Sequence, residues 1–210
     1  EDGLSAAGVC VGRRSGKDGG SAMKIAVIWS SPNTDGLTAA AKDRFLSGLE
    51  KSGAEMAEIH LNKLRLEHCK ACGSGWGSCS SKGQCWIKDD FTSTYQTLAD
   101  ADGIVLVSAV YWHDVTECMK AFLDRLRRCE TAHNHFLEGK RCFLIACAGG
   151  TGLGAVECLH HMEETLKHMG MRAYDRIPVI RYNKDYILPA LECAGELYAD
   201  RLEQGFDMQY

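Results

Sequence analysis

From Lys24 onward, the sequence alternates short apolar runs with longer amphipathic segments. Residues 24–29 and 103–110 are nearly continuous apolar runs, as expected of parallel strands buried on both faces. In the segments between such runs, apolar residues recur at steps of three or four, which is the pattern of a helix with one buried face. This alternation favours right-handed strand–helix–strand units and an open parallel sheet. We therefore predict an α/β fold with five strands and five helices.

Each predicted element can be placed along the chain. The five strands are expected at residues 24–29, 55–61, 103–110, 141–147 and 174–180. The five helices are expected at residues 37–52, 89–98, 115–126, 155–169 and 187–202. Pro178 weakens the prediction of the last strand, because proline cannot donate a hydrogen bond to a neighbouring strand. No internal repeat or linker interrupts this pattern, so residues 23–210 are predicted to form one domain, with a cysteine-rich insert at about 62–88.

Composition excludes several classes of function. A net charge of −4 argues against nucleic acid as a partner. No apolar run approaches the ~18 residues that a membrane-spanning helix needs, so no membrane partner is expected. Residues 1–22 are rich in glycine, serine and charged side chains and lack the apolar stretch of a signal peptide. We interpret them as a flexible tail or a cloning remnant, and we predict a cytoplasmic location.

Eleven cysteines are present, and four of them, Cys69, Cys72, Cys79 and Cys85, lie in one short loop. The other seven are scattered, mostly in apolar segments where a free cysteine behaves as a small hydrophobic residue. Cytosolic thiols stay reduced, so the clustered four indicate a metal site or redox chemistry. They could hold a [4Fe–4S] cluster or a structural zinc ion, or the Cys69–Cys72 pair could act as a dithiol without metal. We favour iron–sulfur over zinc, because only one Cys-x-x-Cys pair is present.

Three other loops follow predicted strands, at the edge of a parallel sheet where ligands bind. The first could bind a phosphate at a helix N-terminus, or be an ordinary capped turn. The second carries two aromatic residues and an imidazole that could flank a flat ring, or that could simply cover the sheet. The third is rich in glycine, which permits close approach of a ligand or merely serves the turn. Their candidate ligand-binding residues are Ser30, Ser31, Asn33, Thr34, Gly36, Leu37 and Thr38; Ala109, Val110, Tyr111, Trp112 and His113; and Ala148, Gly149, Gly150, Thr151 and Gly154.

With these motifs in view, residues 23–175 resemble the NAD(P)H-dependent FMN reductase family, and most of all its iron–sulfur flavoprotein branch. The resemblance rests on Ser30-Ser31-Pro32, on the four-cysteine loop with Asp89-Asp90 after it, and on Val110-Tyr111-Trp112 followed by the segment 119–125. The chain departs from the family at Asn33, where a basic residue is usual, and at Ala109, where proline is usual. Its second and third loop cysteines are also further apart than in the iron–sulfur branch.

The resemblance implies a three-layer, flavodoxin-like fold with a five-stranded parallel sheet in the order 2-1-3-4-5. It implies an FMN phosphate at residues 30–38 and the flavin ring against residues 109–113 and 148–154. It also implies an oxidoreductase that takes electrons from NADH or NADPH, or from another donor, and passes them to a small acceptor such as a quinone, a flavin or an iron–sulfur centre. No side chain is needed as nucleophile or base, because the flavin carries the chemistry. A homodimer or homotetramer is expected.

Two alternatives stay open. The protein could be an iron–sulfur flavoprotein that carries electrons without its own NAD(P)H activity. It could instead be a flavodoxin-like module whose cysteine loop holds zinc for structure.

Overall fold

The computed structural model describes residues 22–130, 132 and 135–205, so nearly all of the predicted tail lies outside the described residues. Five strands form one sheet in the order β2-β1-β3-β4-β5, and every neighbouring pair is parallel. The strands are β1 (Lys24–Ser30), β2 (Glu55–His60), β3 (Gly103–Ala109), β4 (Arg141–Ala148) and β5 (Arg172–Ile180). This confirms the predicted α/β fold and its strand order.

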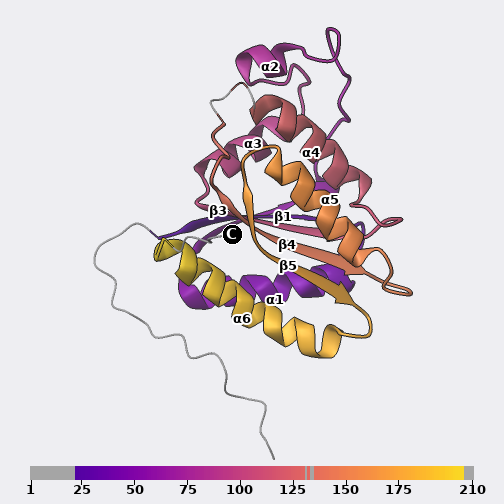
Figure 1. Ribbon diagram of the computed structural model, residues 1–210, viewed down its shortest axis with the longest axis vertical. Coiled ribbons are helices and arrows are strands. Elements are labelled where there is room, and N and C mark those ends of the chain that lie inside the picture. The colour runs from indigo at the N-terminus through magenta and orange to yellow at the C-terminus, as the bar shows by residue number, and fades with distance from the viewer. Residues whose placement is uncertain (1–21, 131, 133–134, 206–210) are drawn as a thin grey trace, which may run out of the picture.

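Helices cover both faces of the sheet and make three layers (Figure 1). One face carries α1 (Leu37–Ser52) and α6 (Lys184–Glu203). The other carries α3 (Phe91–Asp100), α4 (Glu117–Glu130) and α5 (Ala155–Lys167). Two short elements were not predicted: the 3-10 turn η1 (Leu61–Lys63) and helix α2 (Ser78–Lys82), which lies far from the sheet, beyond one end of α4 (Figure 1). Among the helices of the described residues, none combines the length and the hydrophobicity needed to span a bilayer.

The sequence determines these elements through burial and through turn chemistry. Strand β1 is buried from Ile25 to Ser30, as its continuous apolar run predicts. Helix α1 ends at Gly53, whose φ of 78° is the left-handed conformation that glycine adopts without a Cβ clash. Pro178 is tolerated because β5 is an edge strand, so the missing N–H group interrupts no ladder on its outer side.

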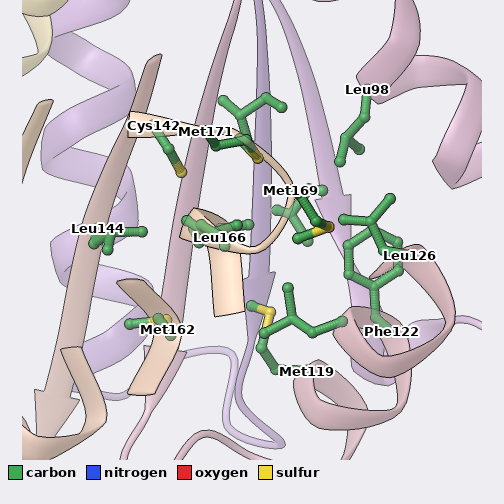
Figure 2. Close-up of a cluster of buried hydrophobic side chains, with 14 of the residues drawn as sticks. Leu98, Met119, Phe122, Leu126, Cys142, Leu144, Met162, Leu166, Met169 and Met171 are labelled. Carbon is green, nitrogen blue, oxygen red and sulfur yellow. The ribbon is translucent and has the colours of Figure 1, made fainter. Parts of the chain in front are cut away.

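The larger core lies between the sheet and helices α3, α4 and α5 (Figure 2). Leucine is its most frequent residue, followed by methionine and alanine, and it includes the buried cysteines Cys142 and Cys158. Burial raises the pKa of the Cys158 thiol to about 12, so this side chain stays protonated and behaves as an apolar group. Cys147 is buried on the opposite face. These three scattered cysteines therefore have the structural role that the sequence predicted.

Helices α1 and α6 cross closely because each has a glycine at the contact. A Cβ at Gly48 would lie 2.0 Å from the carbonyl oxygen of Glu192, and a Cβ at Gly195 would lie 2.3 Å from that of Phe45. We expect Gly48→Ala to lower the free energy of unfolding by about 1–3 kcal/mol, since the two backbones must separate. Urea denaturation would measure this. Ser47→Ala, at a half-exposed neighbouring position of α1, should change stability by no more than about 0.5 kcal/mol. Equal effects of the two substitutions would contradict the close-packing explanation.

Candidate functional site

The three predicted ligand loops meet at the carboxyl edge of the sheet. Three contacts that two hydroxyl groups make with neighbouring elements hold them there. The Ser30 hydroxyl contacts the hydroxyl of Thr116, just before α4, and donates to Asn62 at 3.0 Å. The Thr38 hydroxyl bonds the Cys147 thiol at the end of β4. Both Ser30 and Thr38 are buried, so their hydroxyls join strands and helices to one another and do not face solvent.

The first loop still offers donors to a ligand. Gly36 is the N-cap residue before helix α1 and provides no side-chain hydrogen bond, so the N–H groups of the first turn are directed at the loop. Asn33 and Thr34 are exposed, and the Ser31 hydroxyl accepts the Asn33 N–H at 3.3 Å. Uncapped N–H groups and the positive end of the helix dipole form a site for a phosphate or another anion.

The second loop is a tight turn with a strained backbone. Tyr111 and Asp114 exchange two backbone hydrogen bonds of 2.8 and 3.0 Å. Between them, Trp112 and His113 have φ angles of 48° and 71°, a type I′ geometry that usually selects glycine or asparagine. The Trp112 side chain is 97% exposed. Non-glycine residues keep such a conformation only where the surroundings enforce it, and such strain is common at ligand sites.

The third loop packs against this turn and helps to hold its backbone conformation. Gly154 has a φ of 84°, and a Cβ there would lie 2.7 Å from the Cα atom of His113. A Cβ at Gly152 would lie 3.0 Å from Ile180 at the end of β5. Gly149 and Gly150 have open space on the side where a Cβ would stand. The third loop therefore packs on the second and leaves its middle accessible.

The remaining predicted residues lie at the edges of these loops. Ala148 ends β4, Ala109 ends β3 and Val110 follows it, while Thr151 accepts the backbone N–H of Leu153 at 3.3 Å. Gly36 and Leu37 form the start of α1. The structure thus brings all three loops to one edge, as the sequence predicted.

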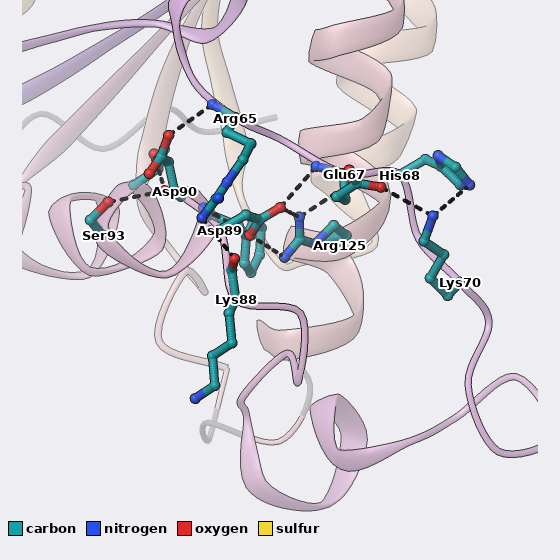
Figure 3. A network of polar contacts seen from close by, with 11 residues as sticks. Arg65, Glu67, His68, Lys70, Lys88, Asp89, Asp90, Ser93 and Arg125 are labelled. Atoms are coloured by element: carbon teal, nitrogen blue, oxygen red, sulfur yellow. Dashed lines mark hydrogen bonds and ion pairs between the residues drawn. The ribbon is translucent and has the colours of Figure 1, made fainter.

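The cysteine-rich insert is a separate region, closed at its base by a polar network (Figure 3). Asp89 accepts two hydrogen bonds of 2.6 and 2.8 Å from the Arg125 guanidinium of α4, and both side chains are buried. Arg125 also donates to the Glu67 carbonyl at 2.9 Å, and the Glu67 N–H donates to Asp89 at 2.8 Å. Asp90 and Arg65 are joined by two further bonds. We call this group, Arg65, Glu67, Asp89, Asp90 and Arg125, the neck of the insert.

Beyond the neck, the loop cysteines line a single pocket against α4. All four predicted metal ligands, Cys69, Cys72, Cys79 and Cys85, line it as free thiols, and a fifth thiol, Cys129, joins them from α4. Burial raises the pKa of Cys129 to about 12, and the nearby thiols of Cys85 and Cys79 add to the increase. Within the described part of the chain, no three histidine, cysteine or carboxylate side chains stand in a ready metal-binding arrangement.

The comparisons with known proteins agree with this geometry. The sequence model of the NADPH-dependent FMN reductase family matches residues 23–183. The chain belongs to this family. An iron–sulfur flavoprotein of Archaeoglobus fulgidus is 32% identical to this FMN reductase family member over 149 residues, which cover 71% of this chain and 64% of that protein. Another, from Methanocaldococcus jannaschii, is 32% identical over 105 residues, covering 50% of this chain and 52% of that one. The predicted family and its iron–sulfur flavoprotein branch are thereby confirmed.

The chain spans about half to two thirds of the length of these curated relatives. Among solved structures, a flavodoxin from an archaeon superposes with a TM-score of 0.59 at 16% identity, covering 86% of this chain and 99% of that one. This likeness concerns the fold alone.

Both groups that the FMN reductase family and its relatives imply can be tested against the residues present. For FMN, the uncapped start of α1 suits the phosphate, and the open glycines beside the strained turn suit a flat ring. For an iron–sulfur cluster, the thiols lining one pocket are the right donor set. Arg125 adds a buried Nε–H group that has no hydrogen-bond partner. The loops at the sheet edge therefore fit FMN. The thiol pocket has the donor atoms that a cluster requires, although the described residues do not gather them into a metal-binding arrangement.

The contribution of α4 to the thiol pocket was not predicted from the sequence. Arg125, Arg128 and Cys129 all line that pocket. Arg128 donates to the Gly75 carbonyl and its guanidinium lies 4.9 Å from the centre of the Trp76 ring. A usable signal was present: Arg125 lies among Phe122, Leu126 and Cys129 on the apolar stripe of α4, where a charged residue requires a partner.

The neck should make the stability of the protein sensitive to acid. Burial by itself raises the pKa of Asp89, but hydrogen bonds from Arg125, Glu67 and Phe91 outweigh it and hold this pKa below its usual value of 3.8. A lowered pKa in the folded state contributes stability above the unfolded value, and this contribution is lost as pH falls through the folded pKa. We expect urea denaturation at a series of pH values to show stability falling below about pH 4.

In Asp89→Asn this acid-dependent loss should be smaller than in the unmodified protein. Burial raises the pKa of Glu130, so the contribution of Glu130 to the pH dependence of stability has the opposite sign. This contribution is the same in both proteins, so it cancels when their stabilities are compared. If the free energy of unfolding fell with pH in the same way in both proteins, the assigned role of Asp89 would be contradicted.

Proposed function

We propose that this protein is an FMN-dependent oxidoreductase that moves electrons from NADH or NADPH, or from another donor, to a small acceptor such as a quinone, a flavin or an iron–sulfur centre. The observation that carries the proposal is the meeting of an uncapped helix start, a strained aromatic turn and a glycine loop at one edge of the sheet. Membership of the NADPH-dependent FMN reductase family supports both the flavin and a nicotinamide donor.

The residues have distinct tasks in this proposal. The first-turn N–H groups of α1, with Ser31, Asn33 and Thr34, bind the phosphate of FMN. Tyr111, Trp112 and His113 border its ring from one loop, and residues 148–154 border it from another. When bound, FMN supplies the redox chemistry, while the protein provides position and electrostatics. No side chain acts as nucleophile or base, and the substrates enter at the open carboxyl edge of the sheet.

The thiol pocket forms a second part of the proposal. The name of the curated relatives, iron–sulfur flavoprotein, and the thiol donor set support a [4Fe–4S] cluster there. Such a group would supply one-electron transfer. The second candidate function, an electron carrier without its own NAD(P)H activity, is favoured by the same pocket. A structural zinc ion is the remaining alternative for the four loop cysteines.

Anaerobic purification followed by FMN titration and spectroscopy tests the proposal. We expect bound or readily acquired FMN, oxidation of NADH or NADPH with an added acceptor, and a broad iron–sulfur absorbance beside the flavin bands. Protein that binds no added FMN would overturn the oxidoreductase. Bound FMN without turnover of either nicotinamide would identify the electron carrier instead, and zinc with no iron–sulfur absorbance would identify the structural module.

The proposal includes a homodimer or homotetramer and a cytoplasmic location. Exposed apolar side chains near the carboxyl edge of the sheet support self-association: Trp112, Leu153, Val156, Tyr182 and Tyr186. Light scattering on purified protein would measure the oligomeric state, and a monomer at micromolar concentration would contradict this part.

A further inference from the structure

The carbonyl group of Ser31, at the start of the first ligand loop, is bound by a side chain from the neighbouring strand. The Nε2 atom of His60, the last residue of β2, lies 2.8 Å from the Ser31 carbonyl oxygen. We propose that His60 is a positioning residue for the phosphate of FMN, because it holds this carbonyl oxygen away from the uncapped start of α1. The inference rests on the proposed flavin function and adds a residue that lies outside the three ligand loops.

The contact with Ser31 indicates which nitrogen atom of His60 carries the hydrogen. A carbonyl oxygen can only accept a hydrogen bond, so Nε2 is assigned as the donor. The other ring nitrogen, Nδ1, is buried and has no hydrogen-bond partner among the described residues. An N–H group buried without an acceptor would be costly, which also favours the hydrogen on Nε2. Both observations therefore assign His60 as a hydrogen-bond donor to the first loop.

The ring of His60 is held in this orientation by Trp29. The two residues are direct partners in the register of β1 and β2, and their rings stack at 3.6 Å with 7° between their planes. The Trp29 indole N–H donates to Glu58 at 2.8 Å. Lys42 of α1 lies 5.0 Å from the centre of the Trp29 ring and 3.0 Å from Glu58. Because the imidazole is fixed in this way, it can orient the loop before a ligand arrives.

The peptide group between Ser31 and Pro32 makes this contact important for an anion. Because residue 32 is proline, the peptide group has a carbonyl oxygen but no N–H group to offer to a phosphate. A carbonyl oxygen that faced the first-turn N–H groups of α1 would compete with a phosphate for them and would repel its charge. The hydrogen bond from His60 keeps this oxygen at the end of β2, so the N–H groups at the start of the helix stay available.

A second contact joins the same ends of β1 and β2. The Ser30 hydroxyl donates to the Asn62 side chain, two residues beyond His60, at 3.0 Å. Two consecutive residues are thus held by neighbouring positions, Ser30 through its side chain and Ser31 through its backbone. The Ser31 hydroxyl is left to the loop, where it accepts the Asn33 N–H at 3.3 Å. The first loop therefore leaves the sheet from a fixed base.

Two substitutions at His60 separate its hydrogen bond from its packing. His60→Phe keeps a flat ring for stacking on Trp29 but removes the donor, whereas His60→Gln keeps an N–H donor. Fluorescence quenching would measure the affinities for FMN and for riboflavin, which lacks the phosphate. We expect His60→Phe to bind FMN about 3- to 10-fold more weakly, with an affinity for riboflavin within about twofold of that of the unmodified protein. His60→Gln should recover most of the FMN affinity.

His168→Phe is the matched control. His168 is an exposed histidine at the C-cap of α5, the end of that helix opposite to the third ligand loop. This substitution should change neither affinity. Circular dichroism and urea denaturation would establish that the variants are folded. If His60→Phe does not fold, His60→Met replaces it, because methionine matches glutamine in length but has no donor.

The outcomes separate this inference from the proposed function. Unchanged FMN affinity in His60→Phe would overturn the inference, and so would an equal loss of affinity for FMN and riboflavin, which would indicate a general packing defect. If riboflavin binds too weakly to be measured, His60→Gln must still bind FMN more tightly than His60→Phe, and equal affinities would overturn the inference. If the unmodified protein binds neither flavin, the proposed function itself fails.

Discussion

Asp89→Ala should lower the free energy of unfolding by about 3–5 kcal/mol, the range for removing one partner of a buried ion pair. The substitution leaves the Arg125 guanidinium buried without its carboxylate partner, since both side chains are at most 2% exposed. It also removes the acceptor for the Glu67 N–H group at the neck. We therefore expect the insert to detach from α4, and any metal bound in the thiol pocket to be lost along with the stability. Urea denaturation and metal analysis would measure the two effects.

A double variant and an exposed ion pair test whether burial of the Asp89–Arg125 pair causes this loss of stability. Asp89→Ala combined with Arg125→Met should recover part of the lost stability, because no buried charge remains unpaired. Asp124→Ala breaks the exposed contact between Lys120 and Asp124 on the same helix and should cost no more than about 1 kcal/mol. Equal costs for Asp89→Ala and Asp124→Ala would show that burial of the neck pair has no energetic importance.

Gly154→Ala should reduce FMN affinity about 10- to 100-fold and lower the free energy of unfolding by about 2–4 kcal/mol. Two effects combine at this position. A Cβ would stand 2.7 Å from the Cα atom of His113, and the φ of 84° is unfavourable for any residue with a Cβ. The strained turn at 111–114 would shift, and with it the aromatic side of the proposed flavin site. Quenching of FMN fluorescence on binding would give the affinity.

Gly149→Ala is the matched control in the same loop. A Cβ at Gly149 meets nothing within 4 Å, and its φ lies outside the left-handed region. The free energy of unfolding should therefore stay close to that of the unmodified protein. A comparable loss of stability in both variants would mean that the loop needs flexibility in general and not the specific contact between Gly154 and His113.

The fold could be predicted from the sequence because each element carried its own signal. The continuous apolar run of β3 and the four-residue steps of α1 needed only local periodicity. The position of the three ligand loops then followed from sheet topology, since the carboxyl ends of parallel strands lie at one edge. Strand β5 was harder to predict because it contains Pro178. Its position at the edge of the sheet explains why this proline is compatible with a strand.

The site was only partly predictable, because side-chain contacts between distant segments leave no local pattern. Ser30 and Thr38 were predicted as ligand-binding hydroxyls, and whether they bind a ligand stays a prediction. The structure uses both hydroxyls in contacts with residues 86 or more positions away, Thr116 and Cys147. The sequence pattern predicted that Cys129 is an ordinary core cysteine. Nothing in its own helix shows that a loop about fifty residues earlier in the chain folds over it.

The neck has a consequence for the evolution and engineering of the protein. Arg65 and Asp90 are joined directly by backbone and side-chain hydrogen bonds, so the chain leaves the domain and returns to it at almost the same point. The closure entropy of the excursion between them depends only weakly on its length. Shortened, lengthened or transplanted versions of the segment can therefore be exchanged at this point with little strain on the sheet, provided that the paired ends are retained.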